Sequence, residues 1–241
     1  SVFGKRVASI NTNSLDSSEL EAAVRQSEIM ARLAPESPEY VPELGVQSYQ
    51  PVQAYYDSTG ELDPLTRAEA AAIAIQQAQA SDQIAASYMD VQAGTSTVAT
   101  SNGLYGSHSN TGVAYTLTSR TVDGLQSGWA GDEANDWNNI ESQRIANDAV
   151  RKCASWRKTR LDPGKYTAIL EPTAVGMLML RMRNAFNQRT ADEGRSYFSK
   201  PGGGNRIGEQ LFDDRVNIYS DPTYADAEVS PFTSEGQARG R

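Results

Sequence analysis

The stretch "VAYTLTSRTVDG", residues 113–124, has the alternation that is typical of a half-buried β-strand. Val113, Tyr115 and Leu117 are separated by Ala or Thr, so one side of the strand is apolar and the other is small or polar. The stretch ends in Val-Asp-Gly at 122–124, a turn signal because Asp and Gly tolerate a positive φ. It therefore predicts a strand, a tight turn and a second strand.

A second turn signal, "SNG" at 101–103, lies upstream of this strand. From Gln83 to Arg120 the sequence is dominated by Thr, Ser, Val and Tyr and carries little charge. Two turns inside a β-prone region indicate neighbouring strands that run in opposite directions. The sequence therefore predicts an antiparallel β-meander from about Gln83 to about Ala130.

Helices are predicted on both sides of this meander. The first is capped by Asp16 or Ser17 and runs to about Leu33, and others begin at Pro64, near Asn138 and at Pro172. Each has apolar residues at helical spacing, which predicts its buried face. In chain order the predicted faces are Leu20, Ala23, Val24, Met30 and Ala31; Leu65, Ala68, Ala72 and Ile75; Ile145, Ala149, Cys153 and Trp156; and Val175, Leu178, Met182 and Phe186.

Short strands are predicted at 1–10, 166–170 and 215–222, where apolar residues are grouped. The proline-rich segment 34–51 is predicted to be a linker or an extended arm, and "PGGGN" at 201–205 a loop. Strands and helices do not alternate regularly along the chain. The fold class predicted is therefore α+β, with mixed or antiparallel sheets and packed helices, rather than a repeating βαβ sheet.

Charge and cysteine content exclude several classes of function. The chain has 241 residues and a net charge of −8, which argues against binding nucleic acid through its phosphates. The Arg and Lys residues of 151–160 are interpreted as a solvated helix face. No apolar run is long enough to span a membrane, so no membrane contact is expected. A single Cys forms no disulfide within the chain, which fits a reducing cytoplasm.

Two residues are candidates for chemistry on their own. His108 is the one histidine and lies among turn-forming residues, where it is predicted to be a plain loop histidine without an acidic neighbour. Cys153 has basic neighbours in sequence, but its helical spacing places it in the core. Neither residue is predicted to be catalytic.

Three further stretches contain residue types that bind ligands in other proteins. "GGGNRIGE" at 202–209 lacks the Lys and the Ser or Thr of a Walker A loop. "NDWNNIES" at 135–142 and "YSDPTYADAE" at 219–228 carry carboxylates without EF-hand spacing. These stretches are predicted to be turns and loops, so the residues alone define no active site.

Several longer motifs resemble the TldD/PmbA family. The last third matches in order, with "DPGKYTAILEPTAV", "EGRSYF", "RIGEQLF", "VNIYSDPTY" and "SPFTSEGQARGR" between 162 and 241. The first third resembles the family in "GKRVASINTNSLDSSELEAAV" at 4–24, and the middle more weakly in "TSNGLYG" at 100–106. The resemblance therefore extends over nearly the whole chain.

The resemblance implies a division into three domains. Residues 1–50 would be the end of an N-terminal α/β domain with its linker, 51–162 a middle domain of helices and β-meander, and 163–241 the start of a C-terminal domain. The sequence opens inside a strand-like pattern and ends without a helix or strand. We therefore expect a fragment of a longer protein, without the family's remaining C-terminal portion.

The family comprises proteins named as modulators of DNA gyrase and metallopeptidases that mature peptides. In its TldD-type members, the helix after Pro-x-Ala-Val carries His-Glu-x-x-x-His, which binds zinc. The matching window here contains Met177, Leu178, Met179, Leu180, Arg181, Met182, Arg183 and Asn184. Because this window has no zinc ligand, the resemblance implies a PmbA/TldE-like member with no metal and no catalytic residue in this chain.

What such a protein would do also follows from the resemblance. It would be a partner subunit in peptide processing, forming a homodimer or a heterodimer with a TldD-like subunit. Its substrate would be an extended peptide that adds to a sheet edge. One alternative is a divergent metallopeptidase whose ligands come from other sequence or from a partner chain. Another is a gyrase-modulating interaction protein, although the acidic charge weighs against direct contact with DNA.

Overall fold

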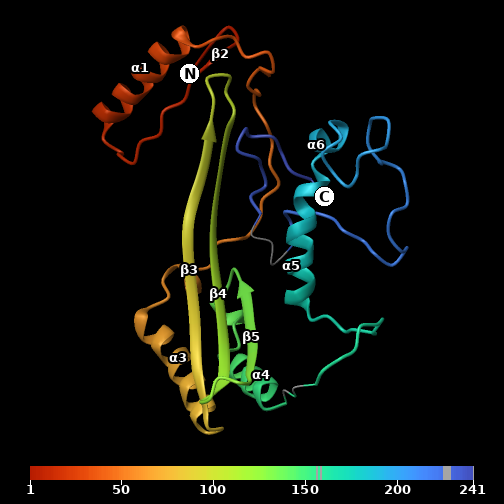
Figure 1. Cartoon of the computed structure of the whole chain (residues 1–241). Coiled ribbons are helices and arrows are strands. Elements are labelled where there is room, and N and C mark those ends of the chain that lie inside the picture. The colour runs from red at the N-terminus through yellow and green to blue at the C-terminus, as the bar shows by residue number, and fades with distance from the viewer. Residues whose placement is uncertain (156, 158, 225–228, 241) are drawn as a thin grey trace.

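A long antiparallel hairpin forms the spine of the computed structural model, which describes residues 1–155, 157, 159–224 and 229–240 (Figure 1). Strands β3 (Gln83–Ala99) and β4 (Tyr105–Thr121) pair along their full length, from Gln83↔Thr121 to Ala99↔Tyr105. At about 3.3 Å per residue each strand is roughly 55 Å long. Gly103, at φ 86°, lies in the turn that joins them, as the Asn-Gly signal predicted.

Strand β5 (Ser127–Ala134) adds to the other edge of β4, from Val113↔Ala134 to Arg120↔Ser127. The sheet order is therefore β3-β4-β5, and the predicted antiparallel meander is confirmed. Gly124, at φ 72°, lies in the second predicted turn. Because β5 is short, it divides the hairpin into a lower half beside β5 and an upper half that ends at Gly103 (Figure 1).

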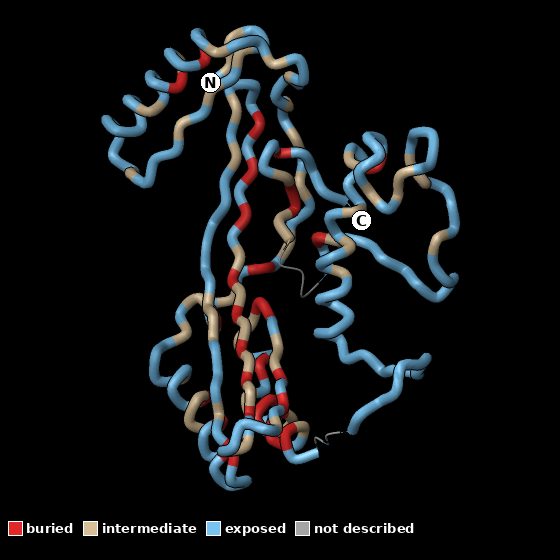
Figure 2. Tube along the Cα trace, in the orientation of Figure 1, coloured by how far each residue is buried: buried red, intermediate tan, exposed pale blue. Residues whose placement is uncertain are grey.

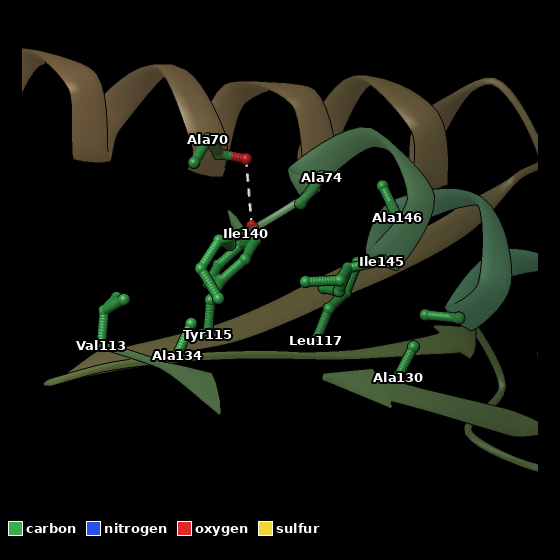
Figure 3. Close-up of a cluster of buried hydrophobic side chains, with 11 residues drawn as sticks. Ala70, Ala74, Val113, Tyr115, Leu117, Ala130, Ala134, Ile140, Ile145 and Ala146 are labelled. Carbon is green, nitrogen blue, oxygen red and sulfur yellow. Dashed lines mark hydrogen bonds between the residues drawn. The ribbon is translucent and has the colours of Figure 1, made fainter. Parts of the chain in front are cut away.

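Helices α3 (Pro64–Gln79) and α4 (Ser142–Ser155) cover one face of the lower half and form the main core with it (Figure 3). The core consists of Ala70, Ala74, Val113, Tyr115, Leu117, Ala130, Ala134, Ile140, Ile145, Ala146 and Ala149. The Tyr115 hydroxyl reaches across the core and donates a 3.0 Å hydrogen bond to the carbonyl oxygen of Ala70. This bond satisfies a polar group that would be costly to bury alone.

The buried side of α3 differs from the predicted one. Leu65 and Ile75 are 68% and 47% exposed, and the predicted face Leu65, Ala68, Ala72 and Ile75 does not contact the sheet as its core face. The helix instead buries Ala70, Ala74 and Ala78. The small side chains on α3 take up little space between the helix and the sheet. The large Tyr115 ring occupies that space (Figure 3).

Helix α4 begins later than predicted. A 3₁₀ turn, η1 (Trp137–Asn139), comes first, because the Asp136 side chain accepts a hydrogen bond from the Asn138 amide and caps this turn. The predicted inward positions Ile145, Ala149 and Cys153 are fully buried, so the core role of Cys153 is confirmed. The fourth predicted position, Trp156, lies outside the described residues.

The hairpin changes its buried face between its two halves. In the lower half the odd residues of β4 from Thr111 to Ser119 are buried, whereas Gly106 and His108 are buried in the upper half. Successive side chains of a strand point to opposite faces, so the upper half is covered from the other side. Figure 2 shows buried positions along the whole length of β4.

The cover of the upper half consists of two segments without regular structure. We call residues 34–56 the arm and residues 229–240 the C-terminal segment. The arm runs along β4 from the turn, where Asn102 Nδ2 donates to the Glu43 carbonyl, to Ala54, whose carbonyl accepts from the Thr111 amide at 2.9 Å. It ends at the short helix α2 (Asp57–Gly60). The predicted extended arm is confirmed.

The N-terminal residues form a small unit near the turn of the hairpin (Figure 1). In place of the single strand predicted at 1–10, two strands of two residues each, β1 (Val2–Phe3) and β2 (Arg6–Val7), form a hairpin. Gly4 turns the chain between them at φ 64°. Helix α1 (Ser17–Leu33) starts after Asp16 as predicted. Of its predicted apolar side only Ala31 is buried, and the other buried residue of the helix is Ser27.

The last third of the chain contains α5 (Pro172–Arg183), η2 (Asn184–Phe186) and α6 (Gln188–Asp192). Residues 166–170 and 215–222 are described in full and contain no strand, so both strand predictions are wrong. Neither segment lies beside a strand with which it pairs, and an apolar run alone does not form a β-strand. Among the described residues, no helix is long and apolar enough to cross a membrane.

Gly128, on β5, allows α4 to pack closely on the sheet because it has no Cβ atom. A Cβ atom at Gly128 would overlap the carbonyl oxygen of Ala149 and the amide nitrogen of Cys153, both on α4. We expect Gly128→Ala to lower the free energy of unfolding by about 1–3 kcal/mol, because α4 must move away from β5. Urea denaturation measures this. The control is Gly94→Ala on β3, where a Cβ meets no atom within 4 Å, and a loss as large in that variant would contradict the explanation.

Candidate functional site

Helix α5 contains residues 177–183 of the 177–184 window and lies beside β5 (Figure 1). Glu171 is its N-cap residue and Pro172 occupies its first position, where a missing amide hydrogen costs nothing. The predicted buried stripe of Val175, Leu178, Met182 and Phe186 is wrong. Val175 and Leu178 are 43% and 55% exposed, and no residue of α5 is buried, because only loops and the rim of β5 lie near it.

A three-way contact links the start of α5 to the core. The Lys152 ammonium, on α4, donates to the Glu171 carboxylate at 2.6 Å and to the carbonyl oxygen of Trp129, on β5, at 3.0 Å. Both bonds are charge-assisted, and the Lys152 side chain is only 26% exposed. This contact positions α5 along β5, because it joins both elements to the same ammonium group.

A groove of about 480 Å³ lies between α5 and β5. Met177 and Leu180 line it on the helix side, and Trp129 and Glu133 on the strand side. The Trp129 ring lies over Gly131, where a Cβ would come within 2.9 Å of it. The walls are therefore largely apolar, with the carboxylates of Asp132 and Glu133 on the strand side.

The edge of β5 next to this groove carries backbone groups that do not pair with β4. The Trp129 carbonyl bonds Lys152, and the Glu133 amide donates to the Asp132 side chain at 3.1 Å. Alternate residues of a strand direct their amide and carbonyl to the same side. Gly131, between them, therefore also directs its backbone groups away from β4. This edge is a template on which another strand can form hydrogen bonds.

A second hollow, of about 550 Å³, lies on the opposite side of α5. Met179 and Phe186 line it together with Ile218 and Tyr219 from the segment that was predicted to be a strand. Gly176 and Leu180 line both hollows, so the helix forms the wall between them. A Cβ added at Gly176 would meet no atom within 4 Å, which shows that this wall is open.

The side chains present do not fit a zinc ion. The window 177–184 has only thioether, aliphatic, guanidinium and amide groups. Of the nearby carboxylates, Asp132 pairs with Arg144 and Glu171 with Lys152, which leaves Glu133 as a single carboxylate beside the groove. Throughout the described parts of the chain, no three His, Cys, Asp or Glu side chains are grouped as metal ligands. A catalytic zinc site usually needs about three such ligands.

His108 is far from this site in the fold, and its predicted environment is wrong. It lies on β4, in the upper half of the hairpin, and its side chain is 8% exposed rather than part of an open loop. Alternating small residues around it form a strand because β3 pairs with them throughout. Turn-forming residue types in "LYGSHSNTG" concealed this position from sequence reasoning.

The other singled-out stretches form local turns. Asp221 Oδ1 accepts from the amide and the hydroxyl of Thr223 at 2.9 and 2.7 Å, which makes Asp-Pro-Thr a turn. Gly202, Gly203 and Gly204 all have positive φ, as expected for the predicted loop. Four of the residues in "YSDPTYADAE", 225–228, lie outside the described residues, as do Lys158 and Arg241 of other motifs.

The motif "PFTSEG" at 231–236 has a structural role that the sequence did not reveal. Gly236, at φ 81°, lies against Leu104, and a Cβ there would come within 2.6 Å of that side chain. Phe232 packs on Tyr49 of the arm with ring centroids 4.8 Å apart. The motif therefore anchors the C-terminal segment on the hairpin and on the arm.

Comparison with known families confirms the resemblance predicted from the sequence. Residues 163–241 match the family model of the PmbA/TldA metallopeptidase C-terminal domain. This range includes α5, the C-terminal segment and the loops between them, over which the matching motifs of the last third are spread. The comparison with curated proteins gives no match.

Solved structures confirm the α+β fold. A candidate modulator of a DNA gyrase from Thermotoga maritima is 17% identical, with 98% of this chain and 54% of that chain covered and a TM-score of 0.77. One from Bacteroides thetaiotaomicron is 21% identical, with coverages of 98% and 55% and a TM-score of 0.80. TldE from Thermococcus kodakarensis is 17% identical, with coverages of 59% and 34% and a TM-score of 0.51. The chain thus spans about half the length of the first two structures.

The position of α5 should depend on Lys152. We expect Lys152→Met to speed amide hydrogen exchange throughout α5, because the helix loses its charged link to β5 and α4. The matched control is Arg151→Met, since among the described residues Arg151 pairs with Asp148, on its own helix. Mass spectrometry of peptides from 172–183 measures the rates. Equal rates in the two variants would show that Lys152 does not hold α5.

Proposed function

Residues 163–241 carry the C-terminal domain of the TldD/PmbA family, and from this premise we propose that the protein is a PmbA/TldE-like subunit of a peptide-processing assembly. In this role it binds an extended peptide and contacts a TldD-like subunit, which supplies the catalytic zinc. The chain itself contributes no metal ligand and no catalytic residue. Its division into units 1–50, 51–162 and 163–241 belongs to the same proposal.

One observation carries this proposal above the others. The helix after the Pro-x-Ala-Val motif borders a groove beside the outer edge of β5, but the window from Met177 to Asn184 has no group that binds zinc. Imidazole and carboxylate are the zinc ligands of hydrolytic sites, whereas a thioether is a soft ligand and a guanidinium is always charged. A groove without zinc ligands favours a subunit that binds substrate without cleaving it.

The peptide is proposed to add to the free edge of β5. The outward amide and carbonyl of Gly131 and the Glu133 carbonyl would bond to the backbone of an extended peptide, so binding would depend little on its sequence. The groove has room for side chains, because its volume is about 480 Å³ and Gly176, in its helix wall, has no side chain. Trp129 and Met177 would contact apolar side chains, and Glu133 would disfavour an acidic peptide.

The name of TldE, one of the structural neighbours, supports the choice of partner. A TldD-like subunit with His-Glu-x-x-x-His has the metal that this chain lacks, and a heterodimer brings the two together. A homodimer of this chain would hold two peptide grooves and no zinc. Peptide cleavage therefore distinguishes the two assemblies, whereas peptide binding alone does not.

Mixing experiments test the role of this subunit. We expect the full protein alone to contain no stoichiometric zinc and to cleave no unstructured peptide. Together with a TldD-like subunit it should form a heterodimer that cleaves the peptide. Size-exclusion chromatography with light scattering, elemental analysis and a peptide cleavage assay measure these properties. Zinc-dependent cleavage by this chain alone would support the divergent metallopeptidase instead.

Filling the groove tests where the peptide binds. We expect Gly176→Trp to weaken binding of a short fluorescent peptide at least tenfold, about 1.4 kcal/mol, because the indole would occupy the space beside β5. Gly176→Ala is the matched control, since its methyl group meets no atom within 4 Å. Fluorescence anisotropy gives the affinities, and thermal melts show that both variants are folded. Equal affinity of both variants would place the peptide elsewhere.

A further inference from the structure

A buried imidazole in the upper half of the hairpin has no role in the proposed function. His108 is the one histidine of the chain, and its side chain is 8% exposed. Its Nε2 atom is buried and forms no hydrogen bond with any described residue. A buried polar atom without a partner is costly, so its retention calls for an explanation.

The cover next to His108 consists of the arm and the C-terminal segment. His108 lines a hollow of about 390 Å³ together with Tyr49, Gln53, Tyr55 and Pro231 of the arm and the C-terminal segment. The Tyr49 ring lies on Gly106, where a Cβ would come within 2.6 Å of its hydroxyl-bearing edge. The Tyr49 hydroxyl donates to the Gly236 carbonyl at 2.7 Å. The arm and the C-terminal segment therefore hold each other in place beside the imidazole.

No charged group lines this hollow. On the arm the titratable residues that face it are Tyr49 and Tyr55, and the C-terminal segment contributes Pro231, while its Glu235 and Arg239 lie outside the lining. The residue opposite His108 on β3 is Ser96. Nothing here neutralises an imidazolium, and burial lowers the pKa of His108. A charged ring without a partner is stable only where water reaches it.

We infer that protonation of His108 at mildly acidic pH releases the arm from the upper half of the hairpin. The neutral ring fits under the arm, whereas the charged ring favours a state in which the arm is lifted and water enters. The docked state is therefore favoured above the undocked pKa of about 6.5 and is lost as the pH falls through and below that value. The arm joins α1 to α2, so its release would free the N-terminal unit from the hairpin.

The single histidine makes the first test direct. In proton NMR its ring signals are identified without assignment, and they should titrate with a midpoint below the usual value of about 6.5. Most carboxylates stay ionised between pH 7.5 and 5.5, so His108 is the side chain that changes charge there. A midpoint at or above the usual value would overturn the inference, because the docked state would then favour the charged ring.

Hydrogen exchange tests whether the arm responds. After correction for intrinsic rates, peptides from 49–55 should exchange faster at pH 5.5 than at pH 7.5, by up to about tenfold, because pH 5.5 lies about one unit below the undocked pKa. Peptides from α3 provide the internal reference. In His108→Leu the arm should stay protected at both pH values, and His108→Gln serves if that variant does not fold. A pH response that persists without His108, or an arm that stays protected while His108 is protonated, would contradict the inference.

Discussion

The pairing of β3 with β4 is the constraint on which the rest of the structure depends. Seventeen residues of each strand are paired, and β5, α3 and α4 all pack on or beside this hairpin. A hairpin of two strands is marginally stable in water by itself, so both of its halves need a cover. Helices α3 and α4 cover the lower half, and the arm and the C-terminal segment cover the upper half on the opposite face. The proposed peptide site and the buried His108 result from these two covers.

Each cover leaves one feature that the other lacks. In the lower half, β5 shields one edge of β4 but presents its own free edge toward α5, and Lys152 joins that edge to the helix. In the upper half, the carbonyl oxygen of Ala54 in the arm accepts a hydrogen bond from the Thr111 amide at the edge of β4. The upper half contains the buried Nε2 atom of His108, which has no hydrogen-bond partner among the described residues. The lower half is thus suited to binding another strand, and the upper half to a change in its cover.

The sequence predicts the parts of this structure that depend on local interactions. Turns at Gly103 and Gly124, the alternation in β4 and the first residues of α1 and α3 depend on neighbours in sequence, and these predictions are confirmed. The faces of α3 and α5 depend on what packs against them, which periodicity does not contain. His108 was assigned to a loop because Ser, Asn and Gly surround it, and pairing with β3 overrode those local preferences. The groove beside α5 combines segments that are distant in sequence, and only the absence of zinc ligands from 177–184 was visible in advance.

The central proposal is that α5 corresponds to the helix that carries His-Glu-x-x-x-His in TldD-type proteins and binds no zinc itself. Its physical basis is the chemistry of the groups between Met177 and Asn184 and the ion pairs that engage Asp132 and Glu171 nearby. The most direct measurement is an anomalous difference map recorded at the zinc absorption edge from crystals of this chain with a TldD-like subunit. The account predicts a zinc peak at the helix of the partner and none beside α5 of this chain. A peak coordinated by residues of this chain next to 177–184 would contradict it.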